Sequence, residues 1–95
     1  MVHTSIMEFE WDPKKEEKNL EKYGISFVAA ARLLAASHYI QSSDRNNEVR
    51  YLAIGEIEQC VLAVVYTKRG DKHRIISARR ASKNEKAKYQ EHCKL

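Results

Sequence analysis

Apolar and polar positions change their spacing along the chain, which separates an early strand and two helices from a run of strands and a final helix. Residues Ile6–Trp11 alternate between apolar and acidic side chains, and this predicts a short strand. Asp12 and Pro13 then supply a helix N-cap and a proline suited to the first helical position. We therefore expect a helix from Pro13 to about Tyr23.

This first helix is very polar, and only Leu20 and Tyr23 offer an apolar stripe. Gly24 can adopt the left-handed conformation that ends a helix. Ser26 can cap a second helix, which we expect to run from Phe27 to about Ser37. Its core face at helical spacing comprises Phe27, Ala30, Ala31, Leu34 and Ala35.

The period changes from helical to extended after the second helix. We expect a short strand at His38–Gln41, a polar turn at Ser42–Asn47, and strands at Glu48–Ile57, Gln59–Arg69 and His73–Arg80. Val61–Val65 and Ile75–Ile76 are almost continuously apolar, which is typical of central strands covered on both faces. The sequence thus favours three or four consecutive strands in one antiparallel sheet.

A last helix should begin near Lys83, because Ser82 and Glu85 have the spacing of a capping box. Its apolar positions are few, namely Ala87 with Tyr89 or Cys93. Helices and consecutive strands are segregated along the chain, so the predicted fold class is α+β. The 95 residues correspond to a single small domain, residues 1–95.

Composition excludes several classes of protein. No apolar stretch approaches the roughly 20 residues that span a bilayer, and the first residues lack a signal-peptide pattern. Cys60 and Cys93 are too few and too widely spaced for a disulfide framework or a Cys-type zinc site. The four histidines, His3, His38, His73 and His92, show no metal-ligand spacing. We expect a cytoplasmic domain with no membrane contact, no metal and no cofactor.

Positive charge is concentrated in about a fifth of the chain. The net charge is +4, but residues 68–88 alone hold nine cations and two anions, a local charge of +7 that leaves −3 elsewhere. Such asymmetry favours a polyanion as partner, either a nucleic acid or an acidic protein. An ordinary basic surface would give the same composition.

The arginines of the last strand are the best candidates for chemistry, since a guanidinium is always charged and binds phosphate at two points. Strict alternation places Arg74 and Arg80 on one face of this strand and Arg79 on the other. We take Arg79 as the site residue and Arg80 as a residue of its rim. The alternative is that Arg79 pairs with Glu85, or with an acid of the first helix, to fix the fold.

A site built from Arg, Lys, Tyr and Glu suits the cleavage of RNA, which carries its own nucleophile in the 2′-hydroxyl. An enzyme need only align that oxygen, stabilise charge on the phosphate and move protons. Tyr89, on the last helix, could stack on a base or relay a proton. Alternatively, it is a helix residue that covers the sheet.

Two stretches resemble the BrnT-type toxins. Phe9-Glu10-Trp11-Asp12-Pro13, followed by Lys15, Asn19, Lys22, Gly24 and Ser26-Phe27, is similar to the opening of that family. Arg50 and Gly55, then Val64 to Thr67 with Arg69, and Arg74 to Ala81 with Glu85 and Tyr89, are similar to its central strand and its ending. The resemblance covers residues 9–89, and the first stretch differs from the family at Tyr23, where histidine is frequent.

The resemblance implies a RelE-like fold and a ribonuclease toxin of a type II toxin–antitoxin system that slows translation. It implies a BrnA-like ribbon-helix-helix antitoxin, contact with operator DNA through that antitoxin, and a hetero-oligomer that can contain a toxin dimer. The candidate catalytic residues are Arg69, Arg79, Glu85, Tyr89 and Lys22, and the candidate RNA-binding residues are Lys68, Arg74, Arg80, Lys83, Lys86 and Lys88.

Two other functions also fit the residues. The same basic region would serve a nucleic-acid-binding protein without catalysis, or an interaction module that receives an acidic partner segment. If the family histidine moves a proton, Tyr23 is a poor replacement at neutral pH, and Lys22 or Glu85 would have to act as the base.

Overall fold

The structure, a computed structural model, describes residues 8–36 and 38–93 and confirms the α+β class. The elements in chain order are β1 (Glu8–Glu10), α1 (Pro13–Tyr23), α2 (Phe27–Ala35), β2 (His38–Ser42), β3 (Tyr51–Ile57), β4 (Cys60–Arg69), β5 (Lys72–Arg80) and α3 (Lys83–Cys93). Most differ from the predicted segments by three residues or fewer at each end. Ile6, Met7 and Ser37, which the first strand and second helix were expected to include, lie outside the described residues.

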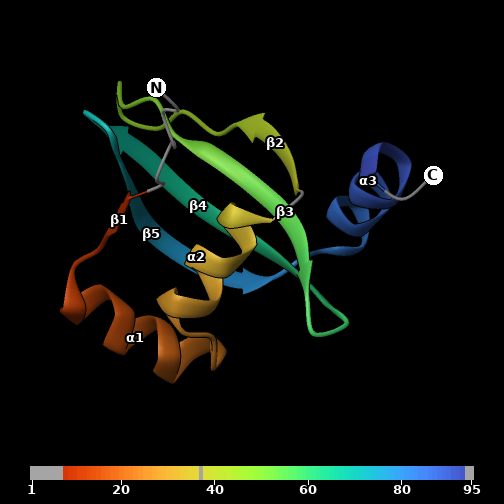
Figure 1. The fold of residues 1–95 in the computed structure, drawn as a ribbon, viewed down its shortest axis with the longest axis horizontal. Coiled ribbons are helices and arrows are strands. Elements are labelled where there is room, and N and C mark those ends of the chain that lie inside the picture. The colour runs from red at the N-terminus through yellow and green to blue at the C-terminus, as the bar shows by residue number, and fades with distance from the viewer. Residues whose placement is uncertain (1–7, 37, 94–95) are drawn as a thin grey trace, which may run out of the picture.

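One mixed sheet of five strands carries the fold, in the order β1-β5-β4-β3-β2 (Figure 1). Strands β2 to β5 form the predicted antiparallel meander. Strand β1 was not expected in this sheet, yet it pairs parallel to β5 over Glu8–Glu10. All other elements except α3 lie between these two strands in the sequence, so their pairing closes a long connection that sequence spacing alone cannot reveal.

The first two helices begin and end where the sequence indicates. The Asp12 side chain caps α1, Gly24 ends it with a φ of 71°, and Ser26 caps α2. The Glu16 carboxylate of α1 also accepts a hydrogen bond of 2.9 Å from the N–H of Phe27, an otherwise unpaired donor in the first turn of α2. This bond connects α1 to the first turn of α2.

Helix α1 buries a polar residue instead of the predicted apolar stripe. Leu20 and Tyr23 remain 44% and 39% exposed, whereas Asn19 is only 6% exposed. The contacts of α1 with the sheet are made chiefly with β5, the strand beside the short β1. The side of α1 that faces the backbone of β5 therefore needs a residue that can form hydrogen bonds, such as Asn19.

Asn19 satisfies the backbone of β5 beyond the end of β1. Strand β1 pairs only with Lys72–Arg74, which leaves the later residues of β5 without a strand neighbour on that edge. The Asn19 amide nitrogen donates to the carbonyl of Ala78 at 2.8 Å, and its oxygen accepts from the Ala78 N–H at 3.1 Å. A further bond of 2.9 Å to the carbonyl of Ile25 holds the α1–α2 connection. The Asn19 side chain thus forms the hydrogen bonds that a neighbouring strand would form with Ala78, and it also holds the α1–α2 connection in place.

Two apolar cores lie on the two faces of the sheet. The larger core, under α2, comprises Phe27, Ala30, Leu33, Leu34, Ala53, Leu62, Val64, Tyr66, Ile75 and Ala78. The smaller core, under α3, comprises Leu52, Ile54, Ala63, Ala81 and Tyr89. Near the middle of β3, Gly55 lets α2 approach closely, because a Cβ atom there would lie 2.9 Å from Cγ of Leu33.

An irregularity in β5 corrects the expected facing of its arginines. Ile75 and Ala78, three residues apart, both belong to the larger core, because the pairing with β4 shifts between Val65 and Tyr66. Strict alternation would have put them on opposite faces. Arg74 and Arg79 therefore share the other face, and the predicted grouping of Arg74 with Arg80 is wrong.

Candidate functional site

Glu85 fastens the end of β5 to the start of α3. The predicted capping box is present, with the Ser82 N–H donating to Oε1 of Glu85 at 2.8 Å and the Glu85 N–H donating to Oγ of Ser82 at 3.2 Å. The same carboxylate accepts two bonds from Arg79, Nη1 to Oε1 at 2.8 Å and Nη2 to Oε2 at 2.9 Å. This two-point geometry holds the guanidinium plane in one orientation.

The pair has a strong electrostatic signature. Hydrogen bonding from Arg79, together with the backbone of Ser82, lowers the pKa of Glu85 from 4.5 to about 2. Hydrogen bonding to Glu85 raises the pKa of Arg79 above its ordinary value. The Arg79 side chain remains 34% exposed, against 14% for Glu85. The expected alternative, an ion pair between these residues, is thus present, and part of the cation still faces solvent.

The C-terminal end of α1 lies near this pair. Tyr23 is within electrostatic range of Arg79 and contributes to its raised pKa. Lys22 Nζ lies 5.2 Å from the centre of the Tyr23 ring. The structure therefore brings three of the candidate catalytic residues, Lys22, Arg79 and Glu85, to the same end of the sheet, with Tyr23 at the position where the family pattern often has histidine.

Tyr89 belongs to the core. Its residue surface is 7% exposed, and its ring packs with Leu52, Ile54 and Ala63 under α3. A ring in this position has no face available for a base, so the structure fits the alternative reading, in which Tyr89 covers the sheet. Helix α3 also contacts β2 through a stacked pair of rings, Tyr39 and His92, whose centres are 4.6 Å apart.

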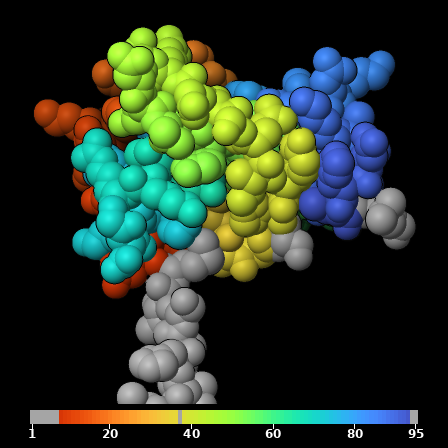
Figure 2. All heavy atoms as spheres, turned by 90° about the horizontal axis from the view of Figure 1, so that it is seen from above, coloured from red at the N-terminus to blue at the C-terminus, as the bar shows by residue number. Residues whose placement is uncertain are grey.

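Arg69 does not join Arg79. Arg69 pairs with Lys72 at the far end of the β4–β5 hairpin, whereas Arg79 pairs with Ala63. The seven-residue step from Lys72 to Arg79 corresponds to about 23 Å of strand. Figure 2 shows the hairpin end, in cyan, and α3, in blue, on opposite sides of the molecule. The single basic region expected from the sequence is therefore divided between two ends of the sheet, because an extended strand separates residues that are close in sequence.

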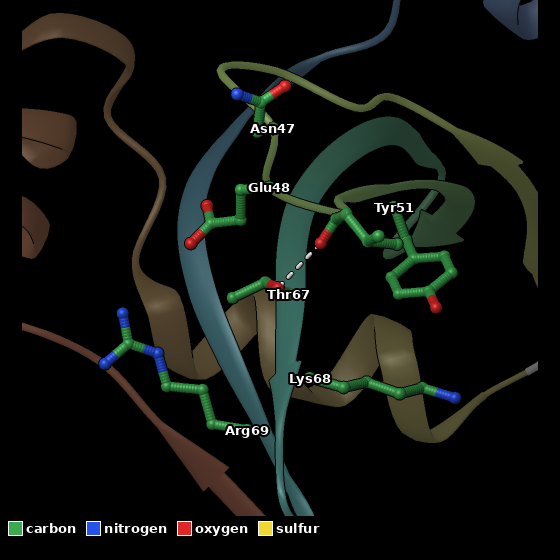
Figure 3. A pocket seen from close by; sticks show the side chains of 7 residues that line it. Asn47, Glu48, Tyr51, Thr67, Lys68 and Arg69 are labelled. Atoms are coloured by element: carbon green, nitrogen blue, oxygen red, sulfur yellow. Dashed lines mark hydrogen bonds between the residues drawn. The ribbon is translucent and has the colours of Figure 1, made fainter.

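The hairpin end holds a cavity of about 320 Å³ beside the loop that precedes β3. Figure 3 shows Arg69 and Glu48 on one side of it and Lys68 with Tyr51 on the other. The Thr67 hydroxyl donates to the carbonyl of Val49 at 2.7 Å and ties the loop to β4. A hydrogen bond from Arg50, reinforced by the charge of Arg69, lowers the pKa of Glu48, so this cavity contains both signs of charge.

The remaining candidate RNA-binding residues are dispersed. Arg74 pairs with Glu10 of β1 at 3.3 Å, and Lys88 donates to Gln41 of β2 at 3.2 Å. Lys83 and Lys86 are exposed on α3. Arg80 is exposed and lines two further cavities, one on each side of the β3–β4 turn, so it is more than the rim residue that the sequence suggested. Sequence reasoning missed these cavities because their walls come from elements that are far apart in the chain, with α1 and α2 lining one and α3 the other.

Neither metal ligation nor membrane insertion finds support in residues 8–36 and 38–93. No group of three or more His, Cys, Asp or Glu side chains in this part of the chain could hold a metal ion. No helix here is both long enough and apolar enough to cross a membrane. Cys60 is exposed and Cys93 is partly buried, and neither forms a disulfide.

Comparison with known proteins gives a consistent family assignment. The family described as ribonuclease toxin, BrnT, of type II toxin-antitoxin system matches residues 11–85. The chain belongs to this family. A 1.1 Å crystal structure of the ribonuclease toxin BrnT of Brucella abortus is similar, with a TM-score of 0.63 and 27% identity. The match covers 82% of this chain and 100% of the Brucella chain. A search of curated proteins found no match.

Membership in the BrnT family supports the function of a ribonuclease toxin, with RNA as substrate and an antitoxin as partner. The family match ends at Glu85, so it includes both members of the ion pair with Arg79 and the end of α1 beside them. The ion pair and the end of α1 therefore both lie within the part of the chain that matches the family.

Proposed function

We propose that this chain is a metal-independent endoribonuclease whose catalytic centre is the junction of β5 and α3. The observation that carries the proposal is the two-point contact between Arg79 and Glu85, which presents a partly exposed guanidinium in a fixed orientation. A fixed cation at this position can stabilise a phosphate in the transition state without reorganising during the reaction.

The reaction assigned to this site uses the nucleophile of the substrate. The RNA 2′-oxygen bonds to the adjacent phosphorus while the bond from phosphorus to the 5′-oxygen of the next nucleotide breaks. The products are a 2′,3′-cyclic phosphate and a 5′-hydroxyl; the proton lost from the 2′-hydroxyl is balanced by one delivered to the leaving oxygen. Arg79 donates hydrogen bonds to the phosphate oxygens, and one such preorganised donor contributes roughly 10²–10³ in rate.

Glu85 acts in this scheme as a positioning residue. A carboxyl group with a pKa of about 2 is ionised at neutral pH and is too weak a base to take a proton efficiently. Its charge and its two acceptor oxygens instead hold Arg79. Lys22, which is exposed and lies beside Tyr23, is the candidate for proton transfer.

The cellular role proposed here follows the family. RNA cleavage slows translation in the cytoplasm until a BrnA-like ribbon-helix-helix antitoxin binds the enzyme. The resulting hetero-oligomer, which can contain a toxin dimer, binds operator DNA through the antitoxin. The net charge of +4 supports a complex with an acidic partner segment.

The test is cleavage of an end-labelled single-stranded RNA by the purified chain in excess EDTA. We expect the wild type to cleave, Arg79→Ala to lose at least 100-fold, and the matched control Arg45→Ala, an exposed arginine of the loop before β3, to retain activity. A single 2′-deoxy substitution at the cleaved nucleotide should abolish cleavage there. Circular dichroism checks that each variant is folded.

Each contrary outcome has a defined meaning. Salt-sensitive RNA binding without strand scission would replace the enzyme with a nucleic-acid-binding protein. Absence of both binding and cleavage would favour an interaction module. Equal cleavage by the wild type and Arg79→Ala would move the catalytic centre away from the β5–α3 junction.

A further inference from the structure

Two cavities lie side by side at the end of the sheet next to the Arg79–Glu85 pair. One, of about 340 Å³, lies between the α1–α2 connection and the β3–β4 turn. The other, of about 370 Å³, lies between that turn and α3. Arg80 and Cys60 line both, so the two cavities adjoin at these residues, and we call them together the double cavity. Figure 1 shows the three segments that surround it.

The first half of the double cavity is aliphatic. Its apolar walls are Leu20, Ile25, Ala29, Ile57 and Leu62. The neighbouring surface carries further exposed apolar groups, since Leu20 is 44% and Val28 is 57% exposed. An apolar hollow flanked by exposed apolar side chains on a small domain indicates a contact site for another protein. Its lining contains no aromatic ring on which a base could stack.

The second half is polar and contains two cations. Arg80 from β5 and Lys86 from α3 line it, together with the amides of Gln59 and Gln90. Neither Arg80 nor Lys86 has an ion-pair partner among the described residues, in contrast to Arg79. A side-chain carboxylate could accept hydrogen bonds from both cations and both amides.

We infer that the double cavity docks a partner protein segment that carries an apolar side chain close to an aspartate or glutamate. The apolar side chain enters the aliphatic half, and the carboxylate binds between Arg80 and Lys86. An RNA strand fits less well, because the aliphatic half offers no aromatic ring on which a base could stack.

The site also explains how such a partner would neutralise the enzyme, a step that rests on the proposed function. Arg80 directly follows Arg79 in β5, so their Cα atoms are about 3.8 Å apart. The two side chains leave opposite faces of the strand. A segment seated on Arg80 and Lys86 crosses the start of α3 and obstructs the approach of RNA to the exposed part of Arg79 without breaking the bond to Glu85.

The test selects random twelve-residue peptides displayed on phage against the immobilised full chain. We expect the selected peptides to share an apolar residue within four positions of an acid. Synthetic copies should bind Arg80→Ala and Leu20→Ser at least tenfold more weakly than the wild type. Both residues are exposed, so these variants should fold, which thermal unfolding checks. The matched control, Arg45→Ala, changes a distant exposed arginine and should bind as the wild type does.

Three results would overturn the inference. Selected peptides without an apolar residue near an acid would do so, as would peptides whose affinity survives both substitutions in the double cavity. A short RNA whose binding is weakened equally by Arg80→Ala and Leu20→Ser would assign the hollow to the substrate. If peptides bind as expected but the chain cleaves no RNA, the docking site stands and only the proposed enzymatic function fails.

Discussion

Arg79 and Glu85 form a two-point ion pair across the junction of β5 and α3, with N–O distances of 2.8 and 2.9 Å. The carboxylate that orients the arginine also completes the capping box of α3 with Ser82. The position of the proposed catalytic group is therefore coupled to the first turn of the last helix, and a change at Glu85 affects both.

This pair should make stability depend on pH in the acidic range. Folding lowers the pKa of Glu85 from 4.5 to about 2. The ionised carboxylate therefore stabilises the fold fully above pH 4.5, and this stabilisation is lost as pH falls towards 2. With allowance for solvent screening, we expect Glu85→Gln to cost about 1–2 kcal/mol at pH 7. Urea unfolding at a series of pH values should show this difference shrinking below pH 4.5. Glu91→Gln, at an exposed position of the same helix, serves as control. A difference in unfolding free energy between the wild type and Glu85→Gln that does not change with pH would contradict the lowered pKa of Glu85.

Arg69 should affect RNA binding and not the chemical step. It pairs with Lys72 at the first residue of β5, and about 23 Å of strand separates Lys72 from Arg79 near the other end. We expect Arg69→Ala to raise KM several-fold, to reduce the salt dependence of binding, and to leave kcat unchanged. Steady-state cleavage at two salt concentrations measures all three. A loss of kcat as large as that of Arg79→Ala would place Arg69 in the catalytic centre.

Asn19 should be among the most sensitive polar residues for stability. Replacing it with alanine leaves the N–H and carbonyl of Ala78, as well as the carbonyl of Ile25, without their partner. Each buried unsatisfied group costs about 1–3 kcal/mol, so we expect Asn19→Ala to lose about 2–4 kcal/mol in urea unfolding. Asn84→Ala, at an exposed position of α3, should change stability little. Similar losses for the two variants would refute the role given to the Asn19 bonds.

Gly55 should be intolerant of a side chain because of its distance to α2. A Cβ atom there would lie 2.9 Å from Cγ and 3.2 Å from Cδ2 of Leu33. We expect Gly55→Ala to destabilise the fold by about 1–3 kcal/mol. Shortening Leu33 to alanine should relieve the crowding, so the double variant should be more stable than the sum of the single losses predicts. Strictly additive losses in a double-mutant cycle would show that the contact is not responsible.

Local sequence signals determined most of the elements. Asp12 with Pro13, Ser26, and the Ser82–Glu85 spacing each act within one turn of helix, so they can be recognised from neighbouring residues alone. The apolar run at Val61–Val65 likewise indicated a central strand, and β4 occupies the middle of the sheet. Each of these features depends on the chain within a few residues of itself.

The site was predicted in part. From the sequence, Arg79 was either a site residue or the ion-pair partner of an acid such as Glu85. The structure shows the ion pair, in which both carboxylate oxygens of Glu85 accept hydrogen bonds from Arg79. Tyr89 could not be placed from the sequence, because a helix with few apolar residues gives no clear core face. Arg69 was grouped with Arg79 since both lie in one basic run, yet strand geometry separates them.

The sequence by itself determined the α+β class, the helix ends, the order of the elements and the family. Only the tertiary structure decided that β1 joins β5, that Asn19 and not Leu20 is buried, and that an irregularity puts Arg74 and Arg79 on one face. These outcomes depend on hydrogen bonds and packing between residues far apart in the chain. Periodicity describes one segment at a time, so it does not contain the partners that such contacts require.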